Sequence, residues 1–133
     1  MTATRQALPL AVAVLALAGC GRAGDQAGVR SVAESFYAAA RGHDGARACT
    51  WLSAGARQAL EQDQSSPCAQ AIAHLKLSGG GARRVQVYST NAAVALRGGE
   101  VVYLETTPRG WRISAAGCRD PAYDTPATCE VQS

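Results

Sequence analysis

The chain has 133 residues, of which 13 are lysine or arginine and 10 are aspartate or glutamate, so its formal net charge is +3. This near balance does not predict nucleic-acid binding, which needs a strongly basic surface. A chain of this length forms one domain rather than two. Its five cysteines are an odd number, which is unusual for an exported protein because one thiol is left without a partner.

The first twenty residues have the parts of an export signal. Arg5 supplies the positive charge, residues 7–18 are almost entirely Ala, Leu and Val, and two small residues precede Cys20. The apolar stretch is shorter than the roughly 20 residues that a membrane span needs, so a retained span is not expected. Residues 17–20 (LAGC) resemble the lipobox of bacterial lipoprotein signal sequences, in which the cysteine carries lipid.

The resemblance implies that residues 1–19 are a signal peptide and that Cys20 becomes the lipid-bearing first residue of the mature chain. The expected location is therefore the outer face of the bacterial plasma membrane, with the membrane as a partner through this lipid. Two or more acyl chains anchor a protein stably, whereas one holds it only marginally. Residues 20–27 are small and polar and are expected to form a flexible tether.

Acylation of Cys20 would leave four cysteines, enough for two disulfides in an oxidising compartment. Three pairings are possible, and the sequence alone does not select one. We favour the local pairs, Cys49–Cys68 and Cys118–Cys129, because each closes a short loop and would stabilise the fold by about 3 kcal/mol.

Helical periodicity predicts four helices before residue 79. They are expected at residues 28–41, 45 to about 52, 54–61 and 67 to about 75. Asp44, Ser53 and Ser66 each precede one of them and are typical N-cap residues. Three glycines at 79–81 end the helical part of the chain.

After the glycines the apolar pattern changes to a period of two, which predicts strands. They are expected at residues 84–88, 92–97, 100–107 and 111–116. Gly98 and Gly99 form a two-residue hairpin signal, so the strands should make an antiparallel meander, with Glu100 solvated at a hairpin tip. Residues 119–133 show no periodicity and are expected to form a tail that the Cys118–Cys129 disulfide pins to the domain.

Helices followed by antiparallel strands predict an α+β fold over residues 28–118, with the N-terminal helices packed on a curved four-stranded antiparallel meander stapled by disulfides. This order, the helix at 28–41 and the segment at 110–113 (GWRI) resemble the nuclear-transport-factor-two-like cone of ketosteroid isomerases and polyketide cyclases. Small lipoproteins of actinobacterial type resemble it too. The resemblance implies a cone-like roll that can enclose an apolar pocket.

The candidates for lining such a pocket are Tyr37, Trp51, Tyr103, Glu105 and Trp111. In isomerase-like enzymes a tyrosine of the first helix is an oxyanion donor, but a core tyrosine with a satisfied hydroxyl is the simpler interpretation of Tyr37. Glu105 is the strand carboxylate to test as a buried base, although a surface pair with Arg112 is simpler. No residue is assigned a catalytic role, because His43 and Asp44 are adjacent and therefore point apart.

The sequence thus favours a non-catalytic, lipid-anchored module that binds a small apolar ligand or an envelope protein partner. A metal site is not expected, since no CxxC motif is present and neither His43 nor His74 has ligand spacing to a cysteine pair. No cofactor is expected either. The alternative is an isomerase-like or cyclase-like enzyme with a buried carboxylate. Four arginines could also form a basic edge facing anionic head groups, although scattered surface arginines are the simpler interpretation: Arg83, Arg84, Arg109 and Arg112.

Overall fold

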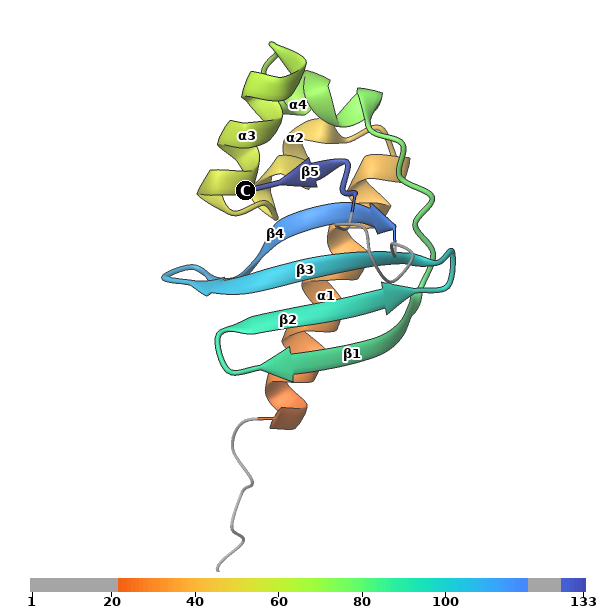
Figure 1. The fold of residues 1–133 in the computed structure, drawn as a ribbon, viewed down its shortest axis with the longest axis vertical. Helices are drawn as coiled ribbons and strands as arrows, with labels where there is room; N and C mark the ends of the chain where they lie inside the picture. The colour runs from red at the N-terminus through yellow and green to blue at the C-terminus, as the bar shows by residue number, and fades with distance from the viewer. Residues whose placement is uncertain (1–21, 120–127) are drawn as a thin grey trace, which may run out of the picture.

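The structure, a computed structural model, describes residues 22–119 and 128–133. One long helix crosses an antiparallel sheet, and shorter helices gather at one end of that sheet (Figure 1). The predicted signal peptide, Cys20 and residues 120–127 of the expected tail lie outside the described residues. None of the described helices combines the length and the apolar character needed to cross a membrane.

The predicted helices and strands occur in the predicted order, with the 3-10 helix η1 and the strand β5 in addition. The helices are α1 (Arg22–Arg41), α2 (Gly45–Thr50), α3 (Ala54–Gln64), α4 (Cys68–Ala71) and the short 3-10 helix η1 (Ile72–His74). The strands are β1 (Ala82–Tyr88), β2 (Asn91–Leu96), β3 (Glu100–Thr107), β4 (Gly110–Arg119) and β5 (Val131–Gln132). They pair antiparallel in chain order. The α+β class is confirmed, but the sheet has five strands instead of four and is open, with β1 and β5 at its edges.

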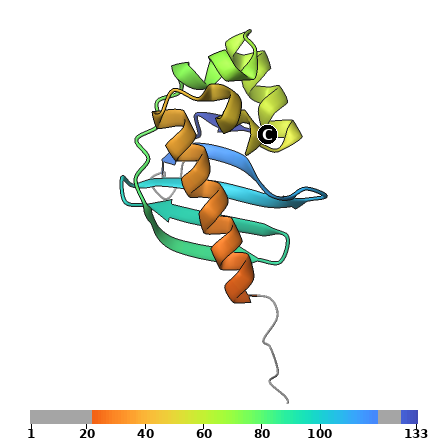
Figure 2. The same ribbon diagram turned by 180° about the vertical axis from the view of Figure 1, so that it is seen from behind.

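The helix α1 lies across one face of the sheet (Figure 2). Its predicted apolar side is buried at Val29, Val32, Ala33, Phe36 and Tyr37. The helix begins at Arg22, so residues 22–27, expected to be a flexible tether, are helical instead. Gly24 and Gly28 have low helix propensity, which moved the expected start later. Asp25 in the first turn complements the helix dipole and favours the earlier start.

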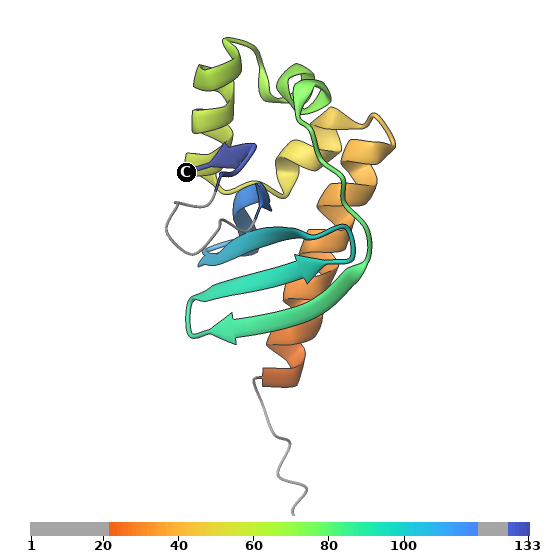
Figure 3. The same ribbon diagram turned by 45° about the vertical axis from the view of Figure 1, so that its right-hand side comes forward.

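The two faces of the sheet differ, as the alternation of side chains along a strand requires. Toward α1 the strands present buried aliphatic residues: Ala92, Val94, Leu96, Val102, Leu104 and Ile113. Each of the larger ones, Val, Leu and Ile, contributes about 2 kcal/mol of hydrophobic stabilisation. Tyr88 and Tyr103, on the other face, are 58% and 40% exposed. Figure 3 shows α1 on one side of the strands, with the short helices beyond the β4 end of the sheet.

The strand β5 was not predicted. Val131 and Gln132 pair with β4, so this part of the expected tail belongs to the sheet. Two residues are too few to show a periodicity, which explains why the sequence gave no signal. The other strands agree with expectation to within two residues, except that β4 continues to Arg119; β2 begins at Asn91, one residue before its expected start.

The structure contains the two local disulfides that the sequence favoured. Cys49–Cys68 joins α2 to the first residue of α4. Cys118–Cys129 joins β4 to the segment that leads into β5. The first bridge therefore spans α3, which lies between α2 and α4 in the chain, and the second closes a shorter loop after β4.

The boundaries of the short helices differ slightly from expectation. The helix α3 continues through the polar stretch to Gln64 and ends at Ser65, whose φ of 48° is left-handed. The helix α4 has Pro67 rather than Ser66 as its N-cap, and no side chain caps it. Asp44 and Ser53 cap α2 and α3 as predicted, accepting from Arg47 N and Ala56 N.

Candidate functional site

The connection between α2 and α3 runs along the edge of β4, and this contact builds the candidate site. Ile113 N donates to Trp51 O at 2.8 Å, and Ser53 N donates to Ile113 O at 2.8 Å. Leu52 thereby forms a parallel bridge with Ile113. These are backbone hydrogen bonds, so they hold the start of α3 beside the β3–β4 turn whatever the neighbouring side chains are.

A cleft of about 560 Å³ lies between these two parts of the chain, and we call it the arginine cleft. The end of α2 and the start of α3 form one wall, and the β3–β4 turn forms the other. Its lining residues are Cys49, Thr50, Leu52, Ser53, Ala54, Arg57, Thr107, Pro108, Arg109 and Arg112. The volume lies within the range of small-molecule sites.

The β3–β4 turn presents Arg109 at the rim of the cleft. Thr107 Oγ1 donates to Gly110 O at 2.8 Å and accepts from Arg109 N at 3.1 Å. Gly110 has a φ of 91°, which favours glycine. The backbone at Arg109 is therefore held in place by the turn, while its side chain is exposed to solvent.

Arg112 is held more firmly than Arg109. Its Nη1 donates to Trp111 O at 2.8 Å, and its Cζ lies 5.6 Å from the centroid of the Trp51 ring. A guanidinium over an indole ring is an attractive cation–π contact worth about 1 kcal/mol at a partly exposed site. The half-buried guanidinium is thus positioned by the protein before any ligand arrives.

Arg57 is the one cleft arginine with an acidic partner in the described part of the chain. Its Nε donates to Glu61 Oε1 at 3.0 Å. The same carboxylate oxygen accepts from Cys68 N at 3.3 Å. Glu61 therefore links α3 to the start of α4, which the Cys49–Cys68 disulfide also joins to α2.

The charge of the arginine cleft is positive. Three guanidinium groups line it, no lining residue is acidic, and Glu61 compensates one of the three charges. Within residues 22–119 and 128–133, Arg109 and Arg112 form no ion pair. Arg112 does lie opposite Glu105 in the strand register, as expected, but it contacts Trp51 instead. The arrangement suits the binding of an anion.

The five residues predicted to line an interior pocket do not come together. Tyr37 is 1% exposed on α1, and Trp51 and Trp111 are half-buried against the core. Tyr103 and Glu105 alternate with the core residues of β3, so they lie on the opposite face of the sheet from α1. None of the five lines the arginine cleft, the hollow along α1 or the hollow where α1 meets α2.

The sequence named two of the three cleft arginines, but in a different grouping. Arg109 and Arg112 were grouped with Arg83 and Arg84 as a basic edge. Arg83 and Arg84 lie on β1, at the far edge of the sheet from β4. Arg57 was not considered, because no local spacing relates a residue of α3 to a turn fifty residues later.

Glu100 is buried, and the expectation that it would be solvated is wrong. Only 1% of its surface is exposed. Its Oε1 accepts from Ser78 N and Ser78 Oγ, both at 2.7 Å, and its Oε2 accepts from Gly79 N at 3.3 Å. The segment after η1 folds back over this end of β3, which a hairpin signal in the local sequence does not reveal.

Tyr37 and Glu100 form a buried polar pair whose pKa values move in opposite directions. Burial by itself raises the pKa of Glu100, but hydrogen bonds from Ser78, Gly79 and Tyr37 outweigh it and hold that pKa below its usual value. Burial and the neighbouring carboxylate raise the pKa of Tyr37 well above its usual value. The Tyr37 hydroxyl also accepts from Gly117 N at 3.1 Å, so it is a satisfied core hydroxyl.

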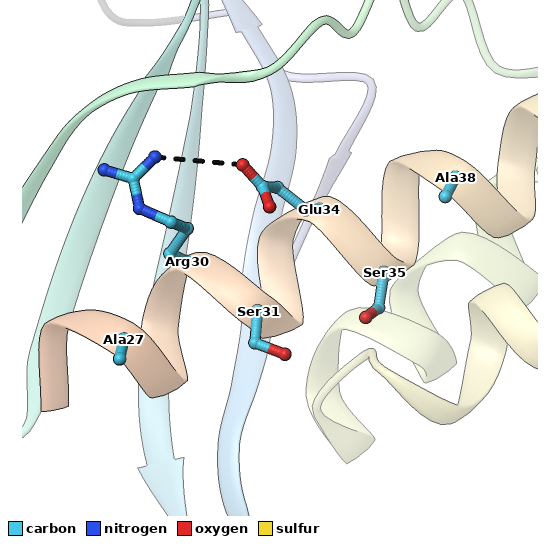
Figure 4. Close-up of a pocket in the computed structure, with 6 residues that line it drawn as sticks. All are labelled: Ala27, Arg30, Ser31, Glu34, Ser35 and Ala38. Atoms are coloured by element: carbon cyan, nitrogen blue, oxygen red, sulfur yellow. Dashed lines mark ion pairs between the residues drawn. The ribbon is translucent and has the colours of Figure 1, made fainter. Parts of the chain in front are cut away.

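Two further hollows are shallow and offer weaker chemistry. One follows the outer side of α1 (Figure 4), where Ala27, Ser31, Ser35 and Ala38 leave space beside the 3.8 Å ion pair of Arg30 with Glu34. The other lies where α1 meets α2, with Asp44 and Arg47 at its rim. Each carries one acidic and one basic side chain, so neither selects the charge of a ligand.

No metal centre is present in the described ranges, since no three His, Cys, Asp or Glu residues there could hold an ion together. Asp44 is exposed and caps α2, so it is not a buried base. Glu105 is half-buried on the face of the sheet away from α1. The chemistry of the described residues is therefore concentrated in the arginine cleft and in the Tyr37–Glu100 pair.

Comparison of the chain with known protein families, with curated proteins and with solved structures finds no match.

Proposed function

We propose that this protein is a lipid-anchored binding module on the outer face of a bacterial plasma membrane, and that a small molecule occupies the arginine cleft. The observation that carries the proposal is the cleft itself, a concave space of about 560 Å³ with apolar and cationic lining residues. Sites of this size and mixed lining are where proteins bind small ligands.

The walls of the cleft are held in place without a ligand. Backbone hydrogen bonds join the α2–α3 connection to β4, a disulfide fixes α2 to α4, and Thr107 braces the opposite turn. A preformed site loses less conformational entropy on binding than a mobile one, so more of the interaction energy appears as affinity.

The proposed location rests on the sequence and on the cysteines. Residues 17–20 (LAGC) resemble a lipobox, and the other four cysteines pair in two disulfides. Disulfides persist in oxidising compartments and are rare in the bacterial cytosol, which supports an exported domain.

We also propose a distant relation to the nuclear-transport-factor-two-like proteins. The order of a long helix, short helices and an antiparallel sheet supports this relation. The open sheet and its short fifth strand depart from the cone that the relation implies. The relation assigns no activity, because function depends on the site and not on the fold.

Filling the cleft tests the proposal. Ala54 is exposed on the cleft wall, and the phenyl ring of Ala54→Phe would occupy the space of a ligand. Gln58→Phe adds a ring to the same helix outside the lining set and is the matched control. We expect native mass spectrometry of the full chain, purified in a neutral detergent from its host envelope, to show a retained small molecule on the natural chain and on Gln58→Phe but not on Ala54→Phe.

Equal retention on Ala54→Phe and Gln58→Phe, or no retained mass on any of the three proteins, would contradict the proposal. Circular dichroism and thermal unfolding of both variants check that the fold is kept. A retained protein subunit, displaced by Ala54→Phe, would move the assignment from a small molecule to an envelope partner.

A further inference from the structure

The arginine cleft carries two uncompensated positive charges on one hairpin. Arg109 stands at the tip of the β3–β4 turn, and Arg112 stands on β4. Glu61 compensates Arg57, and the ten lining residues include no carboxylate to compensate the other two. Two guanidinium charges facing one space repel each other, and an anion between them removes that repulsion.

The hydrogen-bonding capacity of these arginines is largely unused. A guanidinium has five N–H donors and no acceptor. Arg112 uses one of these donors in a described hydrogen bond, from Nη1 to Trp111 O, and its guanidinium lies over the Trp51 ring. That planar fork of N–H groups matches the paired oxygens of a carboxylate or a phosphate.

The remaining lining is mostly apolar or small. The apolar surface comes from Leu52, Ala54, Pro108 and the disulfide-bonded Cys49 side chain. An inorganic ion alone would leave this surface without contacts, whereas an organic group attached to the anion would cover it. The lining therefore favours a ligand with an acidic end and an apolar body.

We propose that the arginine cleft binds the carboxylate or phosphate group of a small organic ligand, with Arg109 and Arg112 as the residues that contact the anion. This inference rests on the proposed binding function and adds the chemical class of the ligand. The acidic group could belong to a free solute or to the head group of an anionic lipid, since the shared chemistry is that of an oxyanion.

Phenyl phosphate is the probe, and phenol is its uncharged counterpart. Trp51 lies under Arg112, so tryptophan fluorescence should report binding in the full chain purified in a neutral detergent. We expect phenyl phosphate to change the fluorescence saturably and phenol to bind at least about tenfold more weakly, because a charge-assisted contact is lost. Arg109→Gln and Arg112→Gln should each weaken phenyl phosphate binding about tenfold.

Arg83→Gln is the control, because it removes an equal charge from exposed β1. It should change the affinity less than about twofold, since screening weakens distant surface charges. Arg109→Lys, which keeps the charge but loses the fork of donors, should fall between the natural chain and Arg109→Gln. Equal binding of phenol and phenyl phosphate, an equal loss in Arg83→Gln, or no binding would overturn the inference.

Vesicles separate the two sources of the anion. Vesicles of phosphatidylcholine mixed with phosphatidylglycerol that displace phenyl phosphate, in competition that depends on Arg109, would identify a lipid head group. Failure to compete, with phenyl phosphate bound, would identify a free solute. If phenyl phosphate does not bind while Ala54→Phe still removes a retained molecule, only the ligand class is wrong and the proposed function stands.

Discussion

At the scale of single residues, the residue outside the cleft with the clearest effect on stability is Glu100, whose carboxylate is buried. Its carboxylate holds Ser78 and Gly79 against the sheet through three hydrogen bonds. Gly79 has a φ of 63°, and a Cβ there would come within 3.0 Å of the Tyr37 ring, so glycine allows the close approach. Arg119 Nη2 lies 3.8 Å from Glu100 Oε1 and adds a second, exposed charge. A buried carboxylate satisfied in this way stabilises the fold.

We expect Glu100→Gln to lower the free energy of unfolding by about 2 kcal/mol. One carboxylate oxygen, which accepts hydrogen bonds, would become an amide nitrogen, which donates them and would face the donors of Ser78 or Gly79. The pKa of Glu100 is lower in the folded chain than its ordinary value of 4.5, so protonation favours unfolding. The stability that ionised Glu100 adds to the fold should be fully present at pH values above the ordinary pKa and should be lost as the pH falls through the lowered pKa. Denaturant unfolding at several pH values measures both effects.

Glu105→Gln, on the outer face of β3, is the control for that experiment because the Tyr37–Glu100 pair stays intact. Its unfolding free energy should remain within about 0.5 kcal/mol of the natural value, as for most surface changes. An unchanged acid dependence in Glu100→Gln would mean that another group links protonation to unfolding.

At the scale of elements, one disulfide joins two short helices and the other joins β4 to the segment before β5. Cys49–Cys68 braces α2, which forms one wall of the cleft. Cys118–Cys129 returns the chain toward β4, where β5 makes two residue pairs. A two-residue strand makes few hydrogen bonds of its own, so we expect the covalent link to help hold β5, together with the burial of Val131 in the core.

Replacing both Cys118 and Cys129 by serine should lower the free energy of unfolding by about 3 kcal/mol and release β5. Hydrogen exchange should then rise at Glu130 N and Ser133 N, which donate to Ala116 O and Ser114 O in the natural chain. The double replacement of Cys49 and Cys68 is the matched comparison, and it should leave these two amides protected. Retained protection in the first variant would show that β5 pairs without the bridge.

At the scale of the whole molecule, α1 connects the proposed anchor to the domain. Its first residue, Arg22, follows Cys20 closely, and its far end meets α2 beside the short helices (Figure 2). If Cys20 carries lipid, a helix rather than a long flexible tether joins the lipid to the sheet. The domain would then be held close to the membrane surface.

The anchor is tested by Cys20→Ala, which removes the acceptor of the lipid. We expect the variant to leave the membrane fraction or to remain as an uncleaved precursor, whereas the natural chain fractionates with membranes. Fractionation with immunodetection and intact mass measure both. Gly21→Ala is the control that keeps the thiol, and a natural chain that begins at Met1 with an unmodified Cys20 would contradict the proposal.

Individual residues show which parts of the fold could be predicted from the sequence and which could not. Tyr37 was correctly interpreted as a core residue, because residues at helical spacing share one face of a helix. Glu100 was misplaced because the residues that bury it, Ser78 and Gly79, are brought to it by the path of the chain after η1. A hairpin signal describes the turn and contains no information about what covers it.

By itself the sequence determined the kinds of element, their order, the buried sides of α1 and the strands, and the preference for local disulfides. Each of these depends on residues that are neighbours along the chain, where spacing and loop length limit the geometry. The tertiary structure decided the bridge between Leu52 and Ile113, the burial of Glu100 and the placement of Arg57, Arg109 and Arg112 around one cleft. Those contacts join segments far apart in the chain, and only packing of the complete sheet and helices selects which of them meet.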